Sequence, residues 1–291
     1  MIRGNWMAQP GPGKIKSKIA KQLAKNAPVL VANSNKVATF GKAIAKLARL
    51  MSRSQHVDWN GKDNECPVYA VGDIHGMADL LDRLLLEIEA DAANLGVPAR
   101  VIFLGDIVNR GPDSRKVVER LLEGPRRLGD EWLVLRGNHE QSLLDALDDD
   151  DAFEKFIPRG VQTMQSYGLT RKSMTRKAFR SALPDSHKTF LEGLPLTCRT
   201  KTHLFVHAGV LPGKQLQDQK PNDLLTIRER FFEKAHTLHR TVVHGHTPTN
   251  GDPVIAEKRI DIDTGAYLTG ILTAVALQCG HEPRFLSVQS R

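Results

Sequence analysis

The sequence is poor in cysteine and has no long apolar run. Its three cysteines, Cys66, Cys198 and Cys279, lie far apart in a chain of 291 residues. An odd number at this spacing excludes a disulfide framework and a CxxC metal site, so we expect three small, buried apolar side chains in a reducing compartment. The best apolar run, residues 268–277, is interrupted by Thr and Gly and is far shorter than the roughly 20 residues of a membrane span. We therefore expect a cytoplasmic protein.

Acidic residues are scarce in only one part of the chain. The protein carries 41 Lys and Arg against 33 Asp and Glu, a formal net charge of +8. Residues 1–66 hold twelve basic and three acidic side chains, whereas the remaining residues hold 29 and 30. This distribution predicts a basic N-terminal leader at residues 1–66, partly disordered or amphipathic helical, joined to a neutral body at residues 67–291.

The leader contains two stretches with helical periodicity. Apolar residues recur every three or four positions within residues 15–23 and 44–51, and lysines stand between them. This spacing is typical of short amphipathic helices with a basic face. Residues 14–53 are thus candidates for contact with an anionic membrane surface or a nucleic acid, which would make the protein peripheral at the membrane. The alternative is a solvated tail, and the sequence predicts no oligomeric state.

The sequence pattern changes at residue 67, after which short apolar runs alternate with segments that have helical periodicity. Helix faces are expected near residues 80–88 and 117–122, and residues 141–195 are predicted to form a helical cap. Strand–helix alternation of this kind predicts an α/β protein with a parallel or mixed sheet. The predicted strands cover residues 68–71, 101–104, 133–135, 203–206, 241–243, 259–262 and 271–277.

Most of these strands end in potential metal ligands. In open α/β sheets, ligands bind beyond the carboxyl ends of the strands, so five strand ends are predicted to meet at one site. Carboxylate, imidazole and amide oxygen together suit Mn²⁺, Fe²⁺ or Zn²⁺. The motifs are Gly72-Asp73-Ile74-His75-Gly76, Gly105-Asp106, Gly137-Asn138-His139-Glu140, Val206-His207-Ala208-Gly209 and His244-Gly245-His246-Thr247.

These motifs, with residues 105–114 and 261–267, resemble the bacterial branch of the phosphoprotein phosphatase family, within the calcineurin-like metallophosphoesterases. The resemblance runs from about residue 67 to the end and does not include the leader. It implies a four-layer α/β/β/α sandwich of two mixed sheets. It also implies two divalent metal ions, for which we expect Mn²⁺, with Fe or Zn as alternatives.

The resemblance assigns a role to each matching residue. Asp73 and His75 would bind the first metal and Asp106 would bridge both. The second metal would be held by Asn138, His207 and His246. Arg110 and Arg228 would bind the phosphate group of the substrate, together with Asn138. His139 would donate a proton to the leaving group, and Asn109 stands where the family has an aspartate partner for this histidine.

The implied reaction is hydrolysis of phosphoserine or phosphothreonine, and also phosphotyrosine, in a phosphoprotein or phosphopeptide. A hydroxide bridging the two metals would attack phosphorus directly. The alternative is a dinucleoside polyphosphate hydrolase of the same superfamily, although residues 109–114 and 223–228 resemble the protein phosphatase branch more closely. A third hypothesis is a nucleic-acid or membrane-binding protein with a vestigial catalytic body, which the complete set of expected ligands disfavours.

Asn109 is a departure from the family pattern. An aspartate favours the imidazolium form by its charge, whereas an asparagine orients the ring only through a hydrogen bond. We therefore predict a lower pKa for His139 than the family pattern implies, unless Asp79 or Asp113 supplies the missing carboxylate.

Three aromatic side chains near the motifs carry weaker expectations. We expect His244 not to be a metal ligand. His203 lies about 13 Å along its strand from His207, because a strand rises roughly 3.3 Å per residue, and is interpreted as structural. Tyr267 is a candidate for the border of the site.

Overall fold

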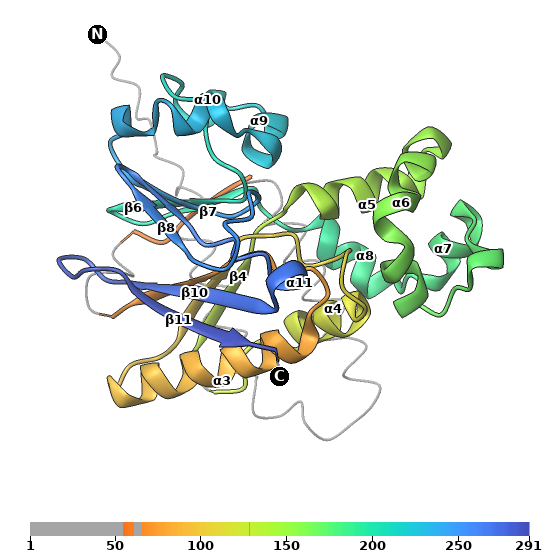
Figure 1. Ribbon diagram of the computed structural model, residues 1–291, viewed down its shortest axis with the longest axis horizontal. Coiled ribbons are helices and arrows are strands. Elements are labelled where there is room, and N and C mark those ends of the chain that lie inside the picture. Colours follow the sequence, from red (N-terminus) through yellow and green to blue (C-terminus); the bar gives the residue numbers. More distant parts are fainter. Residues whose placement is uncertain (1–54, 61–65, 128, 291) are drawn as a thin grey trace, which may run out of the picture. The chain divides into compact units, whose positions relative to one another are not determined.

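The computed structural model describes residues 55–60, 66–127 and 129–290 (Figure 1). The chain divides into two units, Met1–Leu47 and Ala48–Arg291, and the described residues all belong to the second. The predicted leader helices at residues 15–23 and 44–51, and the surface contacts predicted for residues 14–53, lie outside the described residues. None of the described helices is long and apolar enough to cross a membrane.

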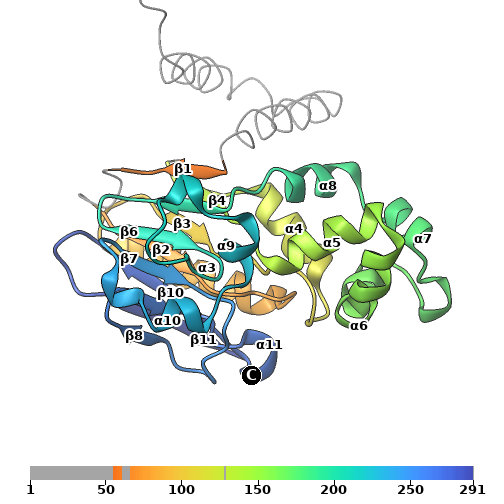
Figure 2. The same cartoon turned by 90° about the horizontal axis from the view of Figure 1, so that it is seen from above.

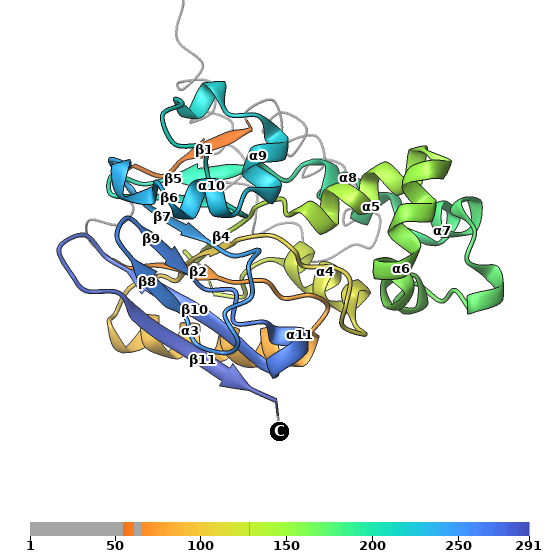
Figure 3. The same ribbon diagram turned by 45° about the horizontal axis from the view of Figure 1, so that its top comes forward.

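The strands of the second unit form two mixed sheets. The six-stranded sheet has the order β1-β5-β6-β7-β9-β8, which Figure 3 shows from top to bottom. Its strands are β1 (His56–Asp58), β5 (Thr197–Arg199), β6 (His203–Val206), β7 (Thr241–His244), β8 (Val254–Ala256) and β9 (Arg259–Asp261). The five-stranded sheet has the order β11-β10-β2-β3-β4, with β2, β3 and β4 parallel. These strands are β2 (Val68–Val71), β3 (Arg100–Phe103), β4 (Glu131–Val134), β10 (Ile271–Leu277) and β11 (Arg284–Gln289).

The described helices fall into three groups. α3 (Ala78–Asn94) and α4 (Ser114–Glu123) follow β2 and β3, and α9 (Pro221–Thr226) and α10 (Glu229–Phe232) lie between β6 and β7 in the chain. A cap of four helices projects to one side of the sheets in both Figure 1 and Figure 2. It consists of α5 (Asn138–Asp148), α6 (Asp150–Ser166), α7 (Arg176–Ala182) and α8 (Asp185–Glu192). Short turns complete the set: η2 (Arg171–Ser173), η3 (Leu216–Asp218), η4 (Ala235–Thr237) and α11 (Ala266–Thr269).

Successive side chains of a strand point to opposite faces of its sheet, so the apolar residues form three clusters between four layers. In β2, Val68 and Ala70 face the other sheet, whereas Tyr69 and Val71 face the helices, because successive side chains point to opposite faces. Apolar residues of α3 and α4 cover the outer face of the five-stranded sheet, and those of α9 and α10 cover the outer face of the other. The structure thus confirms the predicted α/β/β/α sandwich of two mixed sheets.

Four strands escaped the sequence prediction: β1, β5, β8 and β11. Strand β1 is the most consequential, because it lies within the predicted leader and pairs in parallel with β5. The sheet therefore extends into residues that we assigned to the leader. β1, β5 and β8 are only three residues long, too short for an alternation of apolar and polar residues to be recognised.

Candidate metal and phosphate site

Five predicted site residues have a left-handed backbone conformation. Residues other than glycine seldom adopt this conformation, and such strain clusters at functional sites. Two glycines allow carboxylates to come close, because a Cβ atom at Gly137 would collide with Asp106 and one at Gly245 would collide with Asp73. The strained residues are His75 (φ 47°), Asp106 (φ 49°), Asn109 (φ 70°), Arg110 (φ 70°) and His246 (φ 68°).

Asp106 belongs to two groups of side chains that could hold a metal ion, one with His75 and His139 and the other with His207 and His246. Its Oδ2 is 3.6 Å from Nε2 of His75 and 3.9 Å from Nε2 of His139. Its Oδ1 is 3.4 Å from Nε2 of His207, and His246 completes this second group. Each carboxylate oxygen therefore faces a different group, which is the geometry required of a ligand that bridges two metal ions.

Backbone carbonyls orient two buried imidazoles of the site. Nδ1 of His75 is 2.9 Å from the carbonyl oxygen of Val108, and Nδ1 of His207 is 3.1 Å from that of Leu104. Each Nδ1–H donates to its carbonyl, so each Nε2 is left with a lone pair directed into the site. Nε2 of His207 lies 2.9 Å from Oδ1 of Asn138. Both atoms are electron-pair donors, and at this separation they could be neighbouring ligands of one cation.

The charges of the side chains also fit metal ions. Burial, followed by repulsion from Asp263 and Asp106, raises the pKa of Asp73, and burial followed by the charge of Glu140 raises that of Asp106. Burial lowers the pKa of His75 and of His246 to about 4, so both imidazoles are neutral at pH 7. Mutually repelling carboxylates and neutral imidazoles suit added positive charge, which divalent cations would supply.

Asp73 and Tyr267 occupy the border of this centre. The carboxylate of Asp73 accepts a hydrogen bond from the backbone N–H of His246, at 3.2 Å, and lies outside the two ligand groups around Asp106. Tyr267 packs edge-on against His75, with ring centroids 5.0 Å apart, and Arg110 lies over its ring. Tyr267 therefore lies where the sequence predicted it.

Asn109 is the direct partner of His139. Oγ1 of Thr163 donates to Oδ1 of Asn109 at 2.7 Å, which turns the Asn109 amide so that Nδ2 donates to Nδ1 of His139 at 2.9 Å. His139 then carries its proton on Nε2, the nitrogen nearer Asp106. Burial, followed by the charges of His75 and Arg110, lowers the pKa of His139 to about 2. Because burial and neighbouring positive charges cause this shift, the effect of Asn109 itself on the pKa of His139 stays a prediction.

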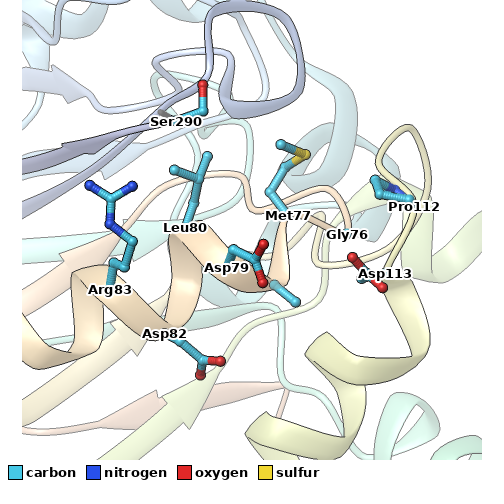
Figure 4. A pocket seen from close by; sticks show the side chains of 10 residues that line it. Gly76, Met77, Asp79, Leu80, Asp82, Arg83, Pro112, Asp113 and Ser290 are labelled. Atoms are coloured by element: carbon cyan, nitrogen blue, oxygen red, sulfur yellow. The ribbon is translucent and has the colours of Figure 1, made fainter.

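Neither Asp79 nor Asp113 replaces the missing family aspartate. Figure 4 shows both side chains on a separate cavity of about 580 Å³, which is also lined by Met77 and Pro112 but not by His139. Asp113 forms an ion pair with Lys116 at 2.7 Å instead. That alternative was wrong because Asp79, at the start of α3, and Asp113, just before α4, line this separate cavity and not the pocket that contains His139.

The site opens into a pocket of about 360 Å³ that contains both predicted phosphate-binding arginines. Nε of Arg228 donates to Nε2 of His246 at 3.2 Å, so this arginine lies against the second ligand group. The pocket is lined by His75, Asp106, Arg110, Asn138, His139, Arg159, Thr226, Arg228, His246, Pro248, Asp263 and Tyr267. The structure therefore brings the predicted catalytic and substrate-binding residues to one place, except Asn109, which supports His139 from behind.

Two other histidines lie away from the pocket lining. His244 is fully buried, packs against Phe231 and lies with Nδ1 3.7 Å from Asp261. His203 contacts the hydroxyl of Thr202. Both placements match the expectation that neither residue is a metal ligand.

Glu140 is the most important supporting residue that the sequence did not reveal. Its fully buried carboxylate accepts four backbone N–H groups: Asp106 (2.8 Å), Ile107 (2.9 Å), Val108 (3.2 Å) and Gly137 (2.8 Å). These bonds hold the loop of the bridging ligand against the start of α5. Its position next to His139 in the motif was a usable signal. Thr163 and Arg159, both on α6, had no signal in the motifs.

Ligand groups that share a carboxylate are what a phosphoester hydrolase with two metal ions requires, and the arginines beside them suit a phosphate group. The fold and the site together thus define a metallophosphoesterase. The chain belongs to the calcineurin-like phosphoesterase family, whose model matches residues 66–282.

Similar proteins are named after two classes of substrate, phosphoproteins and dinucleoside tetraphosphates. The serine/threonine-protein phosphatase 1 of Salmonella typhimurium is 31% identical over 219 residues, which cover 72% of this chain and 92% of the relative. A symmetrical bis(5'-nucleosyl)-tetraphosphatase of Janthinobacterium is 34% identical over 144 residues, 50% of this chain and 44% of the relative. The asymmetrical bis(5'-nucleosyl)-tetraphosphatase PrpE of Oceanobacillus iheyensis is 28% identical over 247 residues, 76% of this chain and 91% of the relative.

Proposed function

We propose that this protein is a phosphoprotein phosphatase that hydrolyses phosphoserine and phosphothreonine, and also phosphotyrosine, with two Mn²⁺ ions. The lining of the pocket carries this proposal. Tyr267 is the only Phe, Tyr or Trp among the described residues that line it, and its ring is already packed against His75 and Arg110. A nucleobase needs an aromatic or apolar surface for stacking. The pocket is instead lined mostly by charged and polar side chains, which suit a phosphoryl group.

The extent of similarity supports the same choice. The match to the serine/threonine-protein phosphatase spans 92% of that protein, whereas the match to the symmetrical tetraphosphatase spans 44% of it. The asymmetrical tetraphosphatase matches over 91% of its length, at lower identity. Dinucleoside polyphosphate hydrolysis is therefore the second candidate.

The residues of the site divide the catalytic work. Two divalent ions held by the ligand groups would lower the pKa of a shared water and polarise the phosphoryl oxygens. Arg110 and Arg228 present planar guanidinium groups that can each hold two phosphoryl oxygens and stabilise the charge of the transition state. The Nε2–H of His139, held in place by Asn109, donates a hydrogen bond to the leaving oxygen.

A substrate panel tests this proposal. We expect the full chain with Mn²⁺ to release phosphate from phosphoserine and phosphothreonine peptides with kcat/KM at least tenfold higher than from diadenosine tetraphosphate. Fe²⁺ and Zn²⁺ serve as parallel metal conditions, and the metal-free protein serves as the blank. Activity on dinucleoside polyphosphates alone would overturn the proposal in favour of the second candidate.

The replacement Asn109→Asp is expected to extend the activity toward phosphoserine to higher pH. The new carboxylate can still accept from Thr163, and its charge raises the pKa of His139. Because a general acid must be protonated, its contribution is lost as the pH rises through its pKa, so a higher pKa moves this loss upward. We expect roughly a tenfold gain on a phosphoserine peptide at pH 7.5, given the 10²–10⁴-fold range of general acid catalysis.

The matched comparison is p-nitrophenyl phosphate, whose leaving group needs no proton and whose rate should change little. Superimposable pH–rate profiles of the wild-type protein and the variant on the phosphoserine peptide would contradict the role of Asn109.

A further inference from the structure

Arg159 is brought to the catalytic pocket by the cap, not by any of the strand ends that carry the sequence motifs. It lies on α6 one turn before Thr163, so the two side chains share a face of the helix. Thr163 is buried against Asn109, whose neighbour is the phosphate-binding Arg110. This contact orients that face of α6 toward the site. Arg159 consequently lines the same pocket as Arg110 and Arg228.

Like Arg110 and Arg228, which line the same pocket, Arg159 has no carboxylate partner among the described residues, whereas several arginines outside the pocket do. Arg176 pairs with Asp150, Arg180 pairs with Asp148 at 2.6 Å, and Arg115 pairs with Glu119 at 2.9 Å. Within the described part of the chain, no Asp or Glu lies within ion-pair distance of Arg159, and its side chain is exposed at the pocket. Its positive charge also reaches His139, where it helps to lower the pKa of the imidazole.

The number of cations exceeds what one phosphoryl group uses. Arg110, Arg228 and two bound metal ions would already contact the oxygens of the group that is cleaved. Asp106 and Asp263 are the only acidic residues among the described pocket-lining side chains, and Asp106 belongs to the metal ligands. A third arginine, mounted on the cap rather than on the sheets, is left for another part of the substrate.

We propose that Arg159 binds a second anionic group of the substrate, adjacent to the phosphoryl group that is cleaved. This inference rests on the proposed function, and in a phosphoprotein the second group is an acidic or phosphorylated side chain next to the phosphorylated residue. Arg159 is thus a specificity-determining residue that selects acidic phosphorylation sites.

Two synthetic phosphoserine peptides test this inference, one with Glu and one with Ala at the residues flanking phosphoserine. We expect the wild-type protein to prefer the Glu peptide in kcat/KM by about fivefold, equivalent to roughly 1 kcal/mol. Arg159→Gln should abolish this preference and Arg159→Glu should reverse it, where each preference is the ratio of the two peptides' kcat/KM values for the same variant. The preference should shrink at 0.5 M salt, because the contact is exposed.

Lys172→Gln is the matched control, because Lys172 is an exposed cation of the same cap that does not line the pocket. This variant should keep the wild-type preference. The same two peptides are also measured as competitive inhibitors of p-nitrophenyl phosphate hydrolysis, which reports binding without turnover. An unchanged Glu-to-Ala inhibition ratio in Arg159→Gln would overturn the inference. Turnover of p-nitrophenyl phosphate but of neither peptide would instead overturn the proposed function.

Discussion

Replacing Asp106 with Asn is expected to lower kcat/KM at least 1000-fold and to remove the protein's ability to hold two metal ions. Both ligand groups depend on this side chain, since Oδ2 faces His75 and Oδ1 faces His207. An amide keeps one oxygen and loses the charge, so it cannot bridge two cations. A 1000-fold loss corresponds to about 4 kcal/mol of transition-state stabilisation. Steady-state kinetics and metal analysis of the purified variant measure the two effects.

The stability of the metal-free protein should move in the opposite direction. Asp106 is fully buried, and its charge is repelled by Glu140 and Asp263. A neutral amide relieves this repulsion, and Asn tolerates the left-handed backbone of this position. We therefore expect the metal-free variant to unfold at an equal or higher temperature than the metal-free wild type. Asp79→Asn is the control, because Asp79 lies on the separate cavity of Figure 4 and should leave activity unchanged. Two bound metals with more than a tenth of the activity would contradict the bridging role.

Replacing Glu140 with Gln is expected to lower the free energy of unfolding by roughly 3 kcal/mol. Each carboxylate oxygen accepts two backbone N–H groups, so an NH₂ group in place of one oxygen leaves two buried donors without an acceptor. An unsatisfied buried donor costs about 1–3 kcal/mol, and part of this is recovered because a buried charge is removed. Metal affinity should also fall, since Asp106 loses the contact that holds its backbone. Urea unfolding of the metal-free proteins measures the stability.

Glu119→Gln provides the comparison for this variant. Glu119 is half exposed and pairs with Arg115 one helical turn away, a contact worth about 0.3–0.5 kcal/mol. Its removal should change the free energy of unfolding by no more than that amount. If Glu140→Gln were equally mild, the four backbone contacts would not stabilise the loop of Asp106 as argued.

Much of the fold was predictable because its strands are long enough to show their pattern. The strands at residues 68–71, 203–206 and 271–277 match the prediction residue for residue, and others agree within two residues. Strand β1 could not be found in this way. It has three residues, lies at the edge of its sheet, and depends on β5, about 140 residues further along the chain.

In the site, too, the residues within sequence motifs were predictable, whereas the contacts made by distant segments were not. The motifs at the strand ends predicted the residues around Asp106, because neighbouring parallel strands end on one side of a sheet. They did not predict the partner of His139 with certainty, since three side chains were candidates. The tertiary structure chose Asn109, because Thr163 on α6 fixes the direction of its amide.

The sequence by itself predicted the α/β class from strand periodicity and a metal site from the ligand types at strand ends, and its resemblance to the metallophosphoesterases implied two metal ions and the residues that would hold them. Only the tertiary structure decided what surrounds these residues: the four bonds of Glu140, the support of Asn109 by Thr163, and the arrival of Arg159 at the pocket. Helical periodicity shows which face of α6 is buried, but it does not show which loop packs against that face. The contact between Thr163 and Asn109 joins residues 54 positions apart in the chain, so it depends on the tertiary structure.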